Sequence, residues 1–233
     1  MKKEEINYGD NLIGYMAHDE SKEGKLPAVL IAPAWAGRDK IHMKMAESIA
    51  ELGLVGFTLD MYGDAKTGNS IEENNELITP FMQDRELLKN RILSAFEKVK
   101  TLPNVDENKI AAIGFCFGGL CVLDLARSGA DLKGVISFHG LLMPPNLPKN
   151  KIRAKVLACH GNDDPMVNHE AVIGLTKELT EAEADWQIHI YGNTKHAFTN
   201  QDANSPELGI VYNETARKRS FQSMENFLSE IFA

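Results

Sequence analysis

The stretch AAIGFCFGGL, residues 111–120, decides the fold. In it a short apolar run stops at Gly114, one cysteine stands between two phenylalanines, and two glycines follow. The residues before Gly114 read as a buried strand, and those from Phe117 to Gly129 read as a helix that ends in a glycine C-cap. Cys116 is therefore predicted to lie on a strand-to-helix turn, outside both elements.

The glycines around Cys116 point to a sharp turn. Such a turn holds its central residue at unfavourable backbone angles and brings the residues two before and two after it into contact, where side chains would clash. Gly114 and Gly118 occupy those two positions. The pattern Gly-x-nucleophile-x-Gly predicts that Cys116 is a nucleophile, the alternative being a buried thiol beside a packing glycine. Cys121 and Cys159, within a helix and a strand, are expected to be buried thiols.

Short apolar runs alternate with longer segments of helical period along the chain. The predicted strands are LIGYMAH (12–18), AVLIA (28–32), LVGFTL (54–59), KIAAIGF (109–115), GVISF (134–138), KVLAC (155–159) and QIHIY (187–191). Apolar residues recur three or four apart over residues 41–52, 88–99, 172–179 and 221–231. This alternation indicates an α/β fold in a single domain, residues 1–233, with helices on both faces of a mostly parallel sheet of about eight strands. The Pro-rich loop after GVISF is too short to form a lid domain.

Chemistry in such a sheet takes place beyond the carboxyl ends of the strands, and further candidates lie there. Asp163 and Asp164 follow the KVLAC strand, and His196 follows the last strand. A thiol nucleophile needs a base, and the base needs an acid that orients it. We therefore predict a triad of Cys116, Asp164 and His196, in the chain order of the α/β-hydrolase fold. Asp164 is preferred to Asp163 because Pro165 fixes the turn that Asp164 opens.

An acyl-transfer site also requires an oxyanion hole, which is formed by two backbone N–H groups. We expect one donor from Phe117, directly after the nucleophile, and the other from Trp35 in the loop after AVLIA, where the indole alternatively packs or lines the pocket. Further residues are predicted to contact substrate: His139, Phe198, Arg38 and Arg85. A solvated surface charge is the alternative for each arginine. His139 and His160 both follow strands, and for each a structural or pocket-lining role is favoured over a role in the chemistry.

The composition of the chain argues against several classes of partner and several kinds of protein. A net charge of −8 argues against nucleic acid or an anionic membrane as the partner. The N-terminal MKKEEINYGD has no apolar region typical of a signal peptide, and no apolar stretch is long enough to span a bilayer. Three cysteines in 233 residues are unlike a disulfide framework. We expect a cytoplasmic protein, either a monomer or a homodimer.

Several motifs resemble the dienelactone hydrolase family. They are GFCFGG, GNDDPMV, KHAFTN, LDMYGDA (59–65) and NRILSAFEKVK, and the resemblance runs from about Val29 to the C-terminal helix. It implies a cysteine-dependent hydrolase of small-molecule esters or lactones that uses no metal and no cofactor. It also maps the triad to Cys116, Asp164 and His196.

Two positions depart from the founding bacterial enzymes of that family. Those enzymes carry a Glu that interacts with the resting thiol, where this chain has Ala34 in its predicted substrate pocket. They also carry an Arg that grips the substrate carboxylate shortly after the catalytic histidine, where this chain has Thr199 and Asn200. We therefore expect a natural substrate other than the chlorocatechol-derived dienelactone. The alternative functions are a non-catalytic or regulatory binding protein of the same fold, and a peptidase that uses the same triad.

Overall fold

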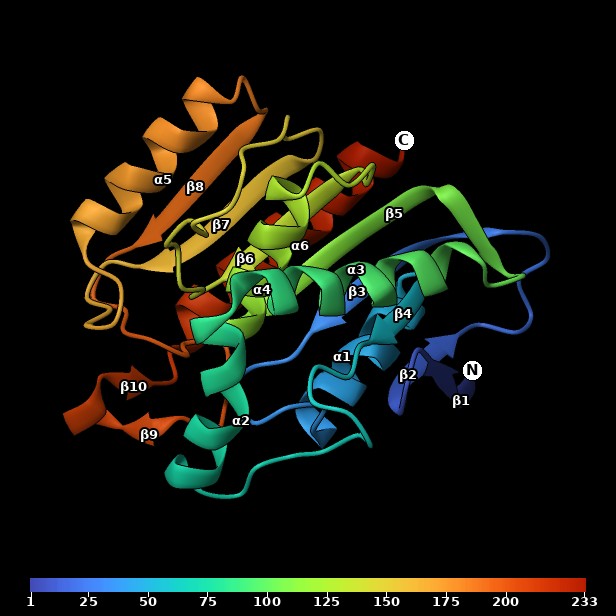
Figure 1. Cartoon of the computed structure of the whole chain (residues 1–233), viewed down its shortest axis with the longest axis horizontal. Coiled ribbons are helices and arrows are strands. Elements are labelled where there is room, and N and C mark those ends of the chain that lie inside the picture. The colour runs from blue at the N-terminus through green and yellow to red at the C-terminus, as the bar shows by residue number, and fades with distance from the viewer. The chain divides into compact units, whose positions relative to one another are not determined.

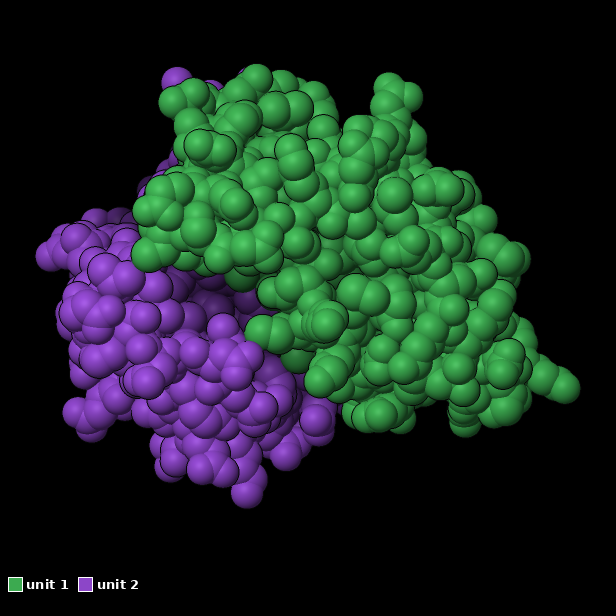
Figure 2. Space-filling view, turned by 90° about the horizontal axis from the view of Figure 1, so that it is seen from below, with its two compact units in different colours: residues 1–113 green, residues 114–233 purple.

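The computed structural model describes residues 1–233, which form two compact units, residues 1–113 and residues 114–233 (Figure 2). The strands run in the order β1-β2-β4-β3-β5 in the first unit and β6-β7-β8 in the second. The pairs β1–β2 and β2–β4 are antiparallel, whereas β3–β4, β6–β7 and β7–β8 are parallel. The predicted α/β fold with a mostly parallel sheet is confirmed. The single domain stays a prediction.

The first unit places helices on strands β1 to β4. Its elements are β1 (Lys2–Tyr8), β2 (Leu12–His18), β3 (Leu26–Ala32), α1 (Lys40–Glu51), β4 (Val55–Thr58), α2 (Ile71–Gln83), α3 (Arg85–Lys100) and most of β5 (Val105–Phe115). Helix α1 packs on β2, β3 and β4, and α3 packs on β3 and β1 (Figure 1). Gly56 on β4 allows the close approach of α1, because a Cβ there would clash with the backbone of Ala46. β3 and β4 end together, since their residues pair in register from Ala28–Val55 to Ile31–Thr58.

The second unit sandwiches its parallel strands between helices. Its elements are α4 (Phe117–Arg127), β6 (Gly134–Phe138), β7 (Lys155–Gly161), α5 (His169–Glu181), β8 (Trp186–Tyr191), β9 (Asn204–Ser205), η1 (Pro206–Leu208), β10 (Ile210–Val211) and α6 (Glu214–Phe232). Ser137 faces α4, because its hydroxyl would meet a Cβ at Gly119, whereas Gly134 faces Phe227 of α6. Since side chains alternate along a strand, α4 and α6 cover opposite faces of β6.

Besides the short elements β9, η1 and β10, two elements have no counterpart among the predicted strands and helices. β1 is an edge strand that pairs only with β2 and is largely exposed. Because it buries little surface, its sequence KKEEINY does not show the apolar pattern by which strands are predicted. Helix α2 begins at Ile71, in a stretch for which the sequence predicts no element, and its start carries a signal that would have identified it. The hydroxyl of the N-cap residue Ser70 accepts a hydrogen bond from the Glu73 N–H, and the Glu73 carboxylate accepts one from the N–H of Asn69, the residue before the cap.

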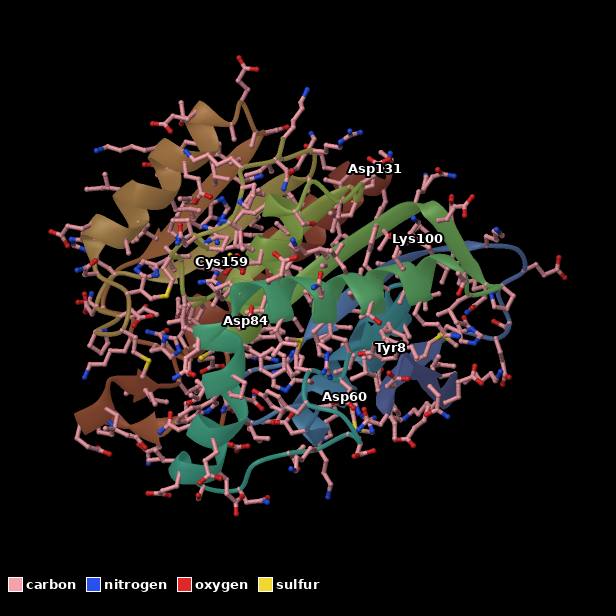
Figure 3. All side chains as sticks on the ribbon, in the orientation of Figure 1. Tyr8, Asp60, Asp84, Lys100, Asp131 and Cys159 are labelled. Carbon is pink, nitrogen blue, oxygen red and sulfur yellow. The ribbon has the colours of Figure 1, made fainter.

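The cysteines inside elements are buried, as predicted. Cys121 on α4 is 0% exposed and Cys159 on β7 (Figure 3) is 1% exposed, whereas Cys116 is partly exposed. Burial raises the pKa of Cys159 to about 12, so its thiol stays protonated and inert at neutral pH. No helix combines the length and the apolar character needed to cross a membrane.

Replacing either buried cysteine with alanine is expected to lower stability without touching catalysis. Cys121→Ala and Cys159→Ala each remove one buried sulfur from a packed interior, which costs about 1 kcal/mol of unfolding free energy. Urea denaturation of both variants measures this loss. Variants as stable as the parent protein would mean that the two thiols lie in space that the surrounding side chains refill without cost.

Candidate active site

The predicted strand-to-helix turn at Cys116 is present in the structure. β5 ends at Phe115 and α4 begins at Phe117, and Cys116 between them has φ 53° and ψ −115°. A positive φ is uncommon outside glycine, and where it occurs it marks a residue that its surroundings hold in place. Backbone hydrogen bonds fix Cys116 in this conformation. Its N–H donates to the Phe138 carbonyl at 3.0 Å, and its carbonyl accepts from the Gly119 N–H at 2.9 Å.

Steric contact explains the glycines of this turn. A Cβ on Gly114 would clash with the carbonyl oxygen of Gly118, and a Cβ on Gly119 would lie 2.6 Å from the Cα of Gly140. Both obstacles are backbone atoms, which cannot rotate away as a flexible side chain can. Side chains at positions 114 and 119 are therefore incompatible with the turn, and the turn keeps Cys116 outside both elements.

His196 and Asp164 meet at the carboxyl ends of β7 and β8. The Nδ1 atom of His196 lies 2.7 Å from Oδ2 of Asp164, and the two residues are 2% and 5% exposed. The backbone of His196 is held on both sides, because its N–H donates to the Gly209 carbonyl and its carbonyl accepts from the Val211 N–H. The other carboxylate oxygen of Asp164 accepts from the Met166 N–H at 2.8 Å. Both oxygens of the acid are thus hydrogen-bonded.

The two neighbouring aspartates differ sharply in environment. Asp164 is buried and bonded to His196, whereas Asp163 is exposed and its carboxylate accepts only from the side chain of Asn162. The backbone N–H of Asp163 donates to the Thr194 carbonyl, which ties this turn to the loop that carries the histidine. The structure therefore joins His196 to the second aspartate and leaves the first at the surface.

Burial and charge act in opposite directions on His196. Burial lowers the pKa of His196 because it disfavours the imidazolium, whereas the charge interaction with Cys116 and the hydrogen bonds to Asp164 and Cys116 raise it. The interactions that raise the pKa outweigh the effect of burial, and the pKa of His196 rises to about 10. Its Nε2 atom is buried. A protonated ring beside Cys116 is suited to giving up a proton to a leaving group.

Two other strand-end histidines are buried beside this pair. The ring of His139 lies 5.2 Å from the ring of His196 and 5.2 Å from the ring of Phe198, edge-to-face in both cases. Phe198 has no exposed surface and packs against His139. His160 is also buried, and burial lowers the pKa of His160, which keeps that ring neutral. Sequence reasoning placed His139 and Phe198 near the site but missed the contact of His139 with Thr199, whose 2.7 Å hydrogen bond spans 60 residues of chain.

Of the remaining predicted site residues, Phe117 is the buried first residue of α4, and the others belong to the first unit. The Trp35 carbonyl accepts from the Tyr62 hydroxyl, and the Ala34 N–H donates to Nε2 of His42, so the loop after β3 is held by side chains. Arg38 is buried, with its Nη2 atom 2.7 Å from the Glu5 carboxylate on β1. Arg85 is the first residue of α3 and is partly exposed. Substrate contacts by these residues stay predictions.

Sequence reasoning passed over Asp60, which organises the loop after β4 in the first unit. Its carboxylate accepts hydrogen bonds from the backbone N–H groups of Ile13, Tyr62, Gly63 and Ala65. Its backbone also exchanges two hydrogen bonds with the Tyr8 hydroxyl, and both residues are labelled in Figure 3. A buried carboxylate with this many backbone donors fixes loop geometry. The signal available in the sequence was the Asp in LDMYGDA.

A cavity of about 310 Å³ lies along α6, apart from the Asp164–His196 pair. Its lining residues are Gln201, Tyr212, Glu214, Arg217, Lys218, Phe221, Gln222 and Glu225. No group of three or more histidine, cysteine, aspartate or glutamate side chains is arranged to hold a metal ion.

Comparisons with known proteins match the whole fold. The sequence model of the dienelactone hydrolase family matches residues 12–232. An uncharacterized protein of Caenorhabditis elegans is 36% identical over 154 residues, which are 63% of this chain and 95% of that protein. A Bradyrhizobium sp. protein named "Probable 2-oxo-3-(5-oxofuran-2-ylidene)propanoate lactonase" is 25% identical over 82% of this chain and 80% of its own. The crystal structure of a dienelactone hydrolase-like promiscuous phosphotriesterase from metagenomic libraries has a TM-score of 0.95 and 35% identity, covering 100% of this chain and 99% of that one.

Proposed function

Because this chain belongs to the dienelactone hydrolase family, and its relatives identify it as a hydrolase of ester or lactone bonds, we propose that it cleaves those bonds through a thioester on Cys116. Asp164 and His196 complete the catalytic triad. One observation carries the proposal: the buried 2.7 Å contact between Asp164 and His196 stands in the same unit as a cysteine held at a positive φ.

In the first half of the reaction, the Cys116 sulfur attacks the substrate carbonyl carbon, and the carbonyl π electrons move onto oxygen. The Phe117 N–H stabilises this oxyanion, since the first N–H groups of a helix have no intrahelical partner. Trp35 stays the predicted second donor. The oxyanion then collapses, the carbon–oxygen bond of the ester breaks, and His196 gives its Nε2 proton to the departing alkoxide.

In the second half, neutral His196 takes a proton from water as the hydroxide forms its bond to the thioester carbon. Collapse of the second tetrahedral intermediate breaks the carbon–sulfur bond and releases the acid together with the Cys116 thiolate. The imidazolium of His196 is restored, and Asp164 holds its Nδ1 proton throughout. When the substrate is a lactone, acid and alcohol leave as a single hydroxy acid.

The charge on His196 gives a prediction about pH. Because the Cys116 thiolate contributes to raising the pKa of His196 above its usual 6.5 to about 10, the ring is expected to stay protonated across neutral pH. Cys116→Ala removes the negative sulfur and leaves burial, which acts downward, so the His196 pKa is expected to fall. An NMR titration of the His196 ring protons in both proteins measures the change. Equal titration points would refute the charge interaction between the two residues.

Substrate class is tested with matched panels of p-nitrophenyl esters, small lactones and peptide anilides. We expect turnover of esters and lactones but not of anilides, since an amine is a poorer leaving group than an alkoxide. Turnover of anilides at comparable rates would favour the peptidase alternative. Absence of all turnover by a folded protein would favour a binding protein of this fold.

A second candidate activity is hydrolysis of phosphotriesters, because the structural relative with 35% identity is a promiscuous phosphotriesterase. The Cys116 sulfur would attack phosphorus and expel an aryloxide, and water would then attack phosphorus, break the phosphorus–sulfur bond and release the phosphodiester and the thiolate. Adding an aryl phosphotriester to the panel tests this activity, and loss of its turnover in Cys116→Ala would place it at the same site.

A further inference from the structure

His139 and Thr199 form a buried pair that the triad does not include. The Nε2 atom of His139 and the Thr199 hydroxyl are 2.7 Å apart, and the two residues are 2% and 9% exposed. His139 has φ 38°, so the chain holds a residue other than glycine in the left-handed region here. The His139 N–H donates to the Cys159 carbonyl at 2.8 Å, which anchors this backbone to β7.

The ring of His139 is enclosed by aromatic rings. It lies edge-to-face against His196 at 5.2 Å with an interplanar angle of 66°, and edge-to-face against Phe198 at 5.2 Å and 80°. The ring of Phe115, next to the proposed nucleophile, lies 6.2 Å away. His139 therefore touches the flank of the proposed base, and the Thr199 hydroxyl fixes the orientation of the His139 ring.

His196 needs such a contact because only one of its hydrogen bonds persists through the reaction. The 2.7 Å bond from Nδ1 to Asp164 fixes one ring atom, whereas the ring's other partner, the Cys116 side chain, is the proposed reacting group and is acylated during turnover. A ring held at one atom can tilt about that atom. Proton transfer requires the far nitrogen to stay within hydrogen-bond reach of the sulfur and of the leaving group. Packing by neighbouring side chains must therefore hold the His196 ring in its orientation.

We propose that His139 is a positioning residue, whose ring, locked by Thr199, keeps His196 in the orientation that proton transfer needs. This inference rests on the proposed function of Cys116, Asp164 and His196. In this proposal His139 affects catalysis by orienting His196, and not by the substrate contact that the sequence predicts for it. The distinction is measurable, because a residue that orients the base affects kcat, whereas a residue that only binds substrate affects KM.

The test compares His139→Asn, Thr199→Val and Thr199→Ser in ester hydrolysis. Asparagine tolerates a positive φ better than most residues, so His139→Asn removes the ring without adding backbone strain. We expect it to lower kcat by about 100-fold with KM nearly unchanged, as a displaced catalytic group does. Thr199→Val, which removes the hydroxyl, is expected to lower kcat by about tenfold, whereas Thr199→Ser, which retains it, keeps kcat within about twofold.

The matched control is a second histidine–hydroxyl pair in the same unit. His189 Nδ1 lies 3.0 Å from the Ser223 hydroxyl, and the two residues stand on β8 and α6. His189→Asn is expected to leave kcat unchanged. The NMR resonance of the His196 Nδ1 proton supplies a readout that a general loss of stability would not move, and it is expected to shift or broaden in His139→Asn and to stay in place in His189→Asn.

Three results separate this inference from the proposed function. Unchanged kcat in His139→Asn, or a rise confined to KM, would overturn the positioning role while leaving the triad intact. An unmoved His196 resonance in a folded but slow His139→Asn variant would overturn it as well. Full activity of Cys116→Ala would instead refute the triad itself, and with it the premise on which the positioning role depends.

Discussion

Cys116→Ala is expected to lower kcat/KM for esters and lactones by about 10⁴-fold or more, because no thioester can form without the sulfur. The protein should stay folded. Cys116 is only partly exposed, but it sits on the turn between β5 and α4 and its backbone bonds to Phe138 and Gly119 do not involve the side chain. Steady-state kinetics and a thermal melt of the same preparation measure the two effects together.

The matched control is Cys121→Ala, which removes a thiol five residues away on α4. Cys121 is fully buried, so its loss should lower stability and leave kcat/KM unchanged. The two variants therefore have opposite signatures. A Cys116→Ala protein that melts normally and still hydrolyses esters would remove Cys116 from the mechanism, whatever the geometry around it.

Asp164→Asn is expected to lower kcat by about 10³-fold or more, through the tautomer of His196. One carboxylate oxygen of Asp164 accepts from the Met166 N–H at 2.8 Å, and the other meets Nδ1 of His196 at 2.7 Å. An asparagine would keep its oxygen on Met166, since only an oxygen can accept that bond. Its amide N–H₂ would then face His196, where it would favour a lone pair on Nδ1 and a proton on Nε2.

That proton placement disables the base, because neutral His196 must take protons at Nε2. Asp163→Asn makes the same chemical change one residue earlier, on an exposed carboxylate that contacts only Asn162. It should change kcat by less than about threefold, as surface substitutions away from a site do. Comparable losses in both variants would point to disruption of the whole turn, and a larger loss in Asp163→Asn would transfer the role to Asp163.

The features that could be predicted from the sequence are those set by interactions between residues close together in the chain. The turn at Cys116 could be predicted because its steric demands act on residues two or three positions away, so Gly114 and Gly119 carry the signal within six letters of sequence. The alternation of strands and helices could be predicted for a similar reason, since each element carries its own period. Asp164 and His196 could be proposed because the fold sends the ends of successive parallel strands to one edge.

Other features depend on contacts that no local pattern records. β1 is a polar edge strand, and only its pairing with β2 makes it a strand. The partnership of His139 and Thr199 joins residues 60 positions apart, and neither residue type alone indicates the other. The burial of Arg38 beside Glu5 likewise depends on where β1 lies, and the sequence alone left a solvated charge as the alternative.

The thioester on Cys116 is the central claim, and quenched-flow mass spectrometry of the parent protein with a slowly hydrolysed ester tests it most directly. We predict an early burst of alcohol, with the acyl mass found on the peptide that contains Cys116. The adduct should disappear as the acid is released, and Cys121 and Cys159 should stay unmodified. Steady turnover without any acylated Cys116, or an acyl group on another residue, would contradict the account.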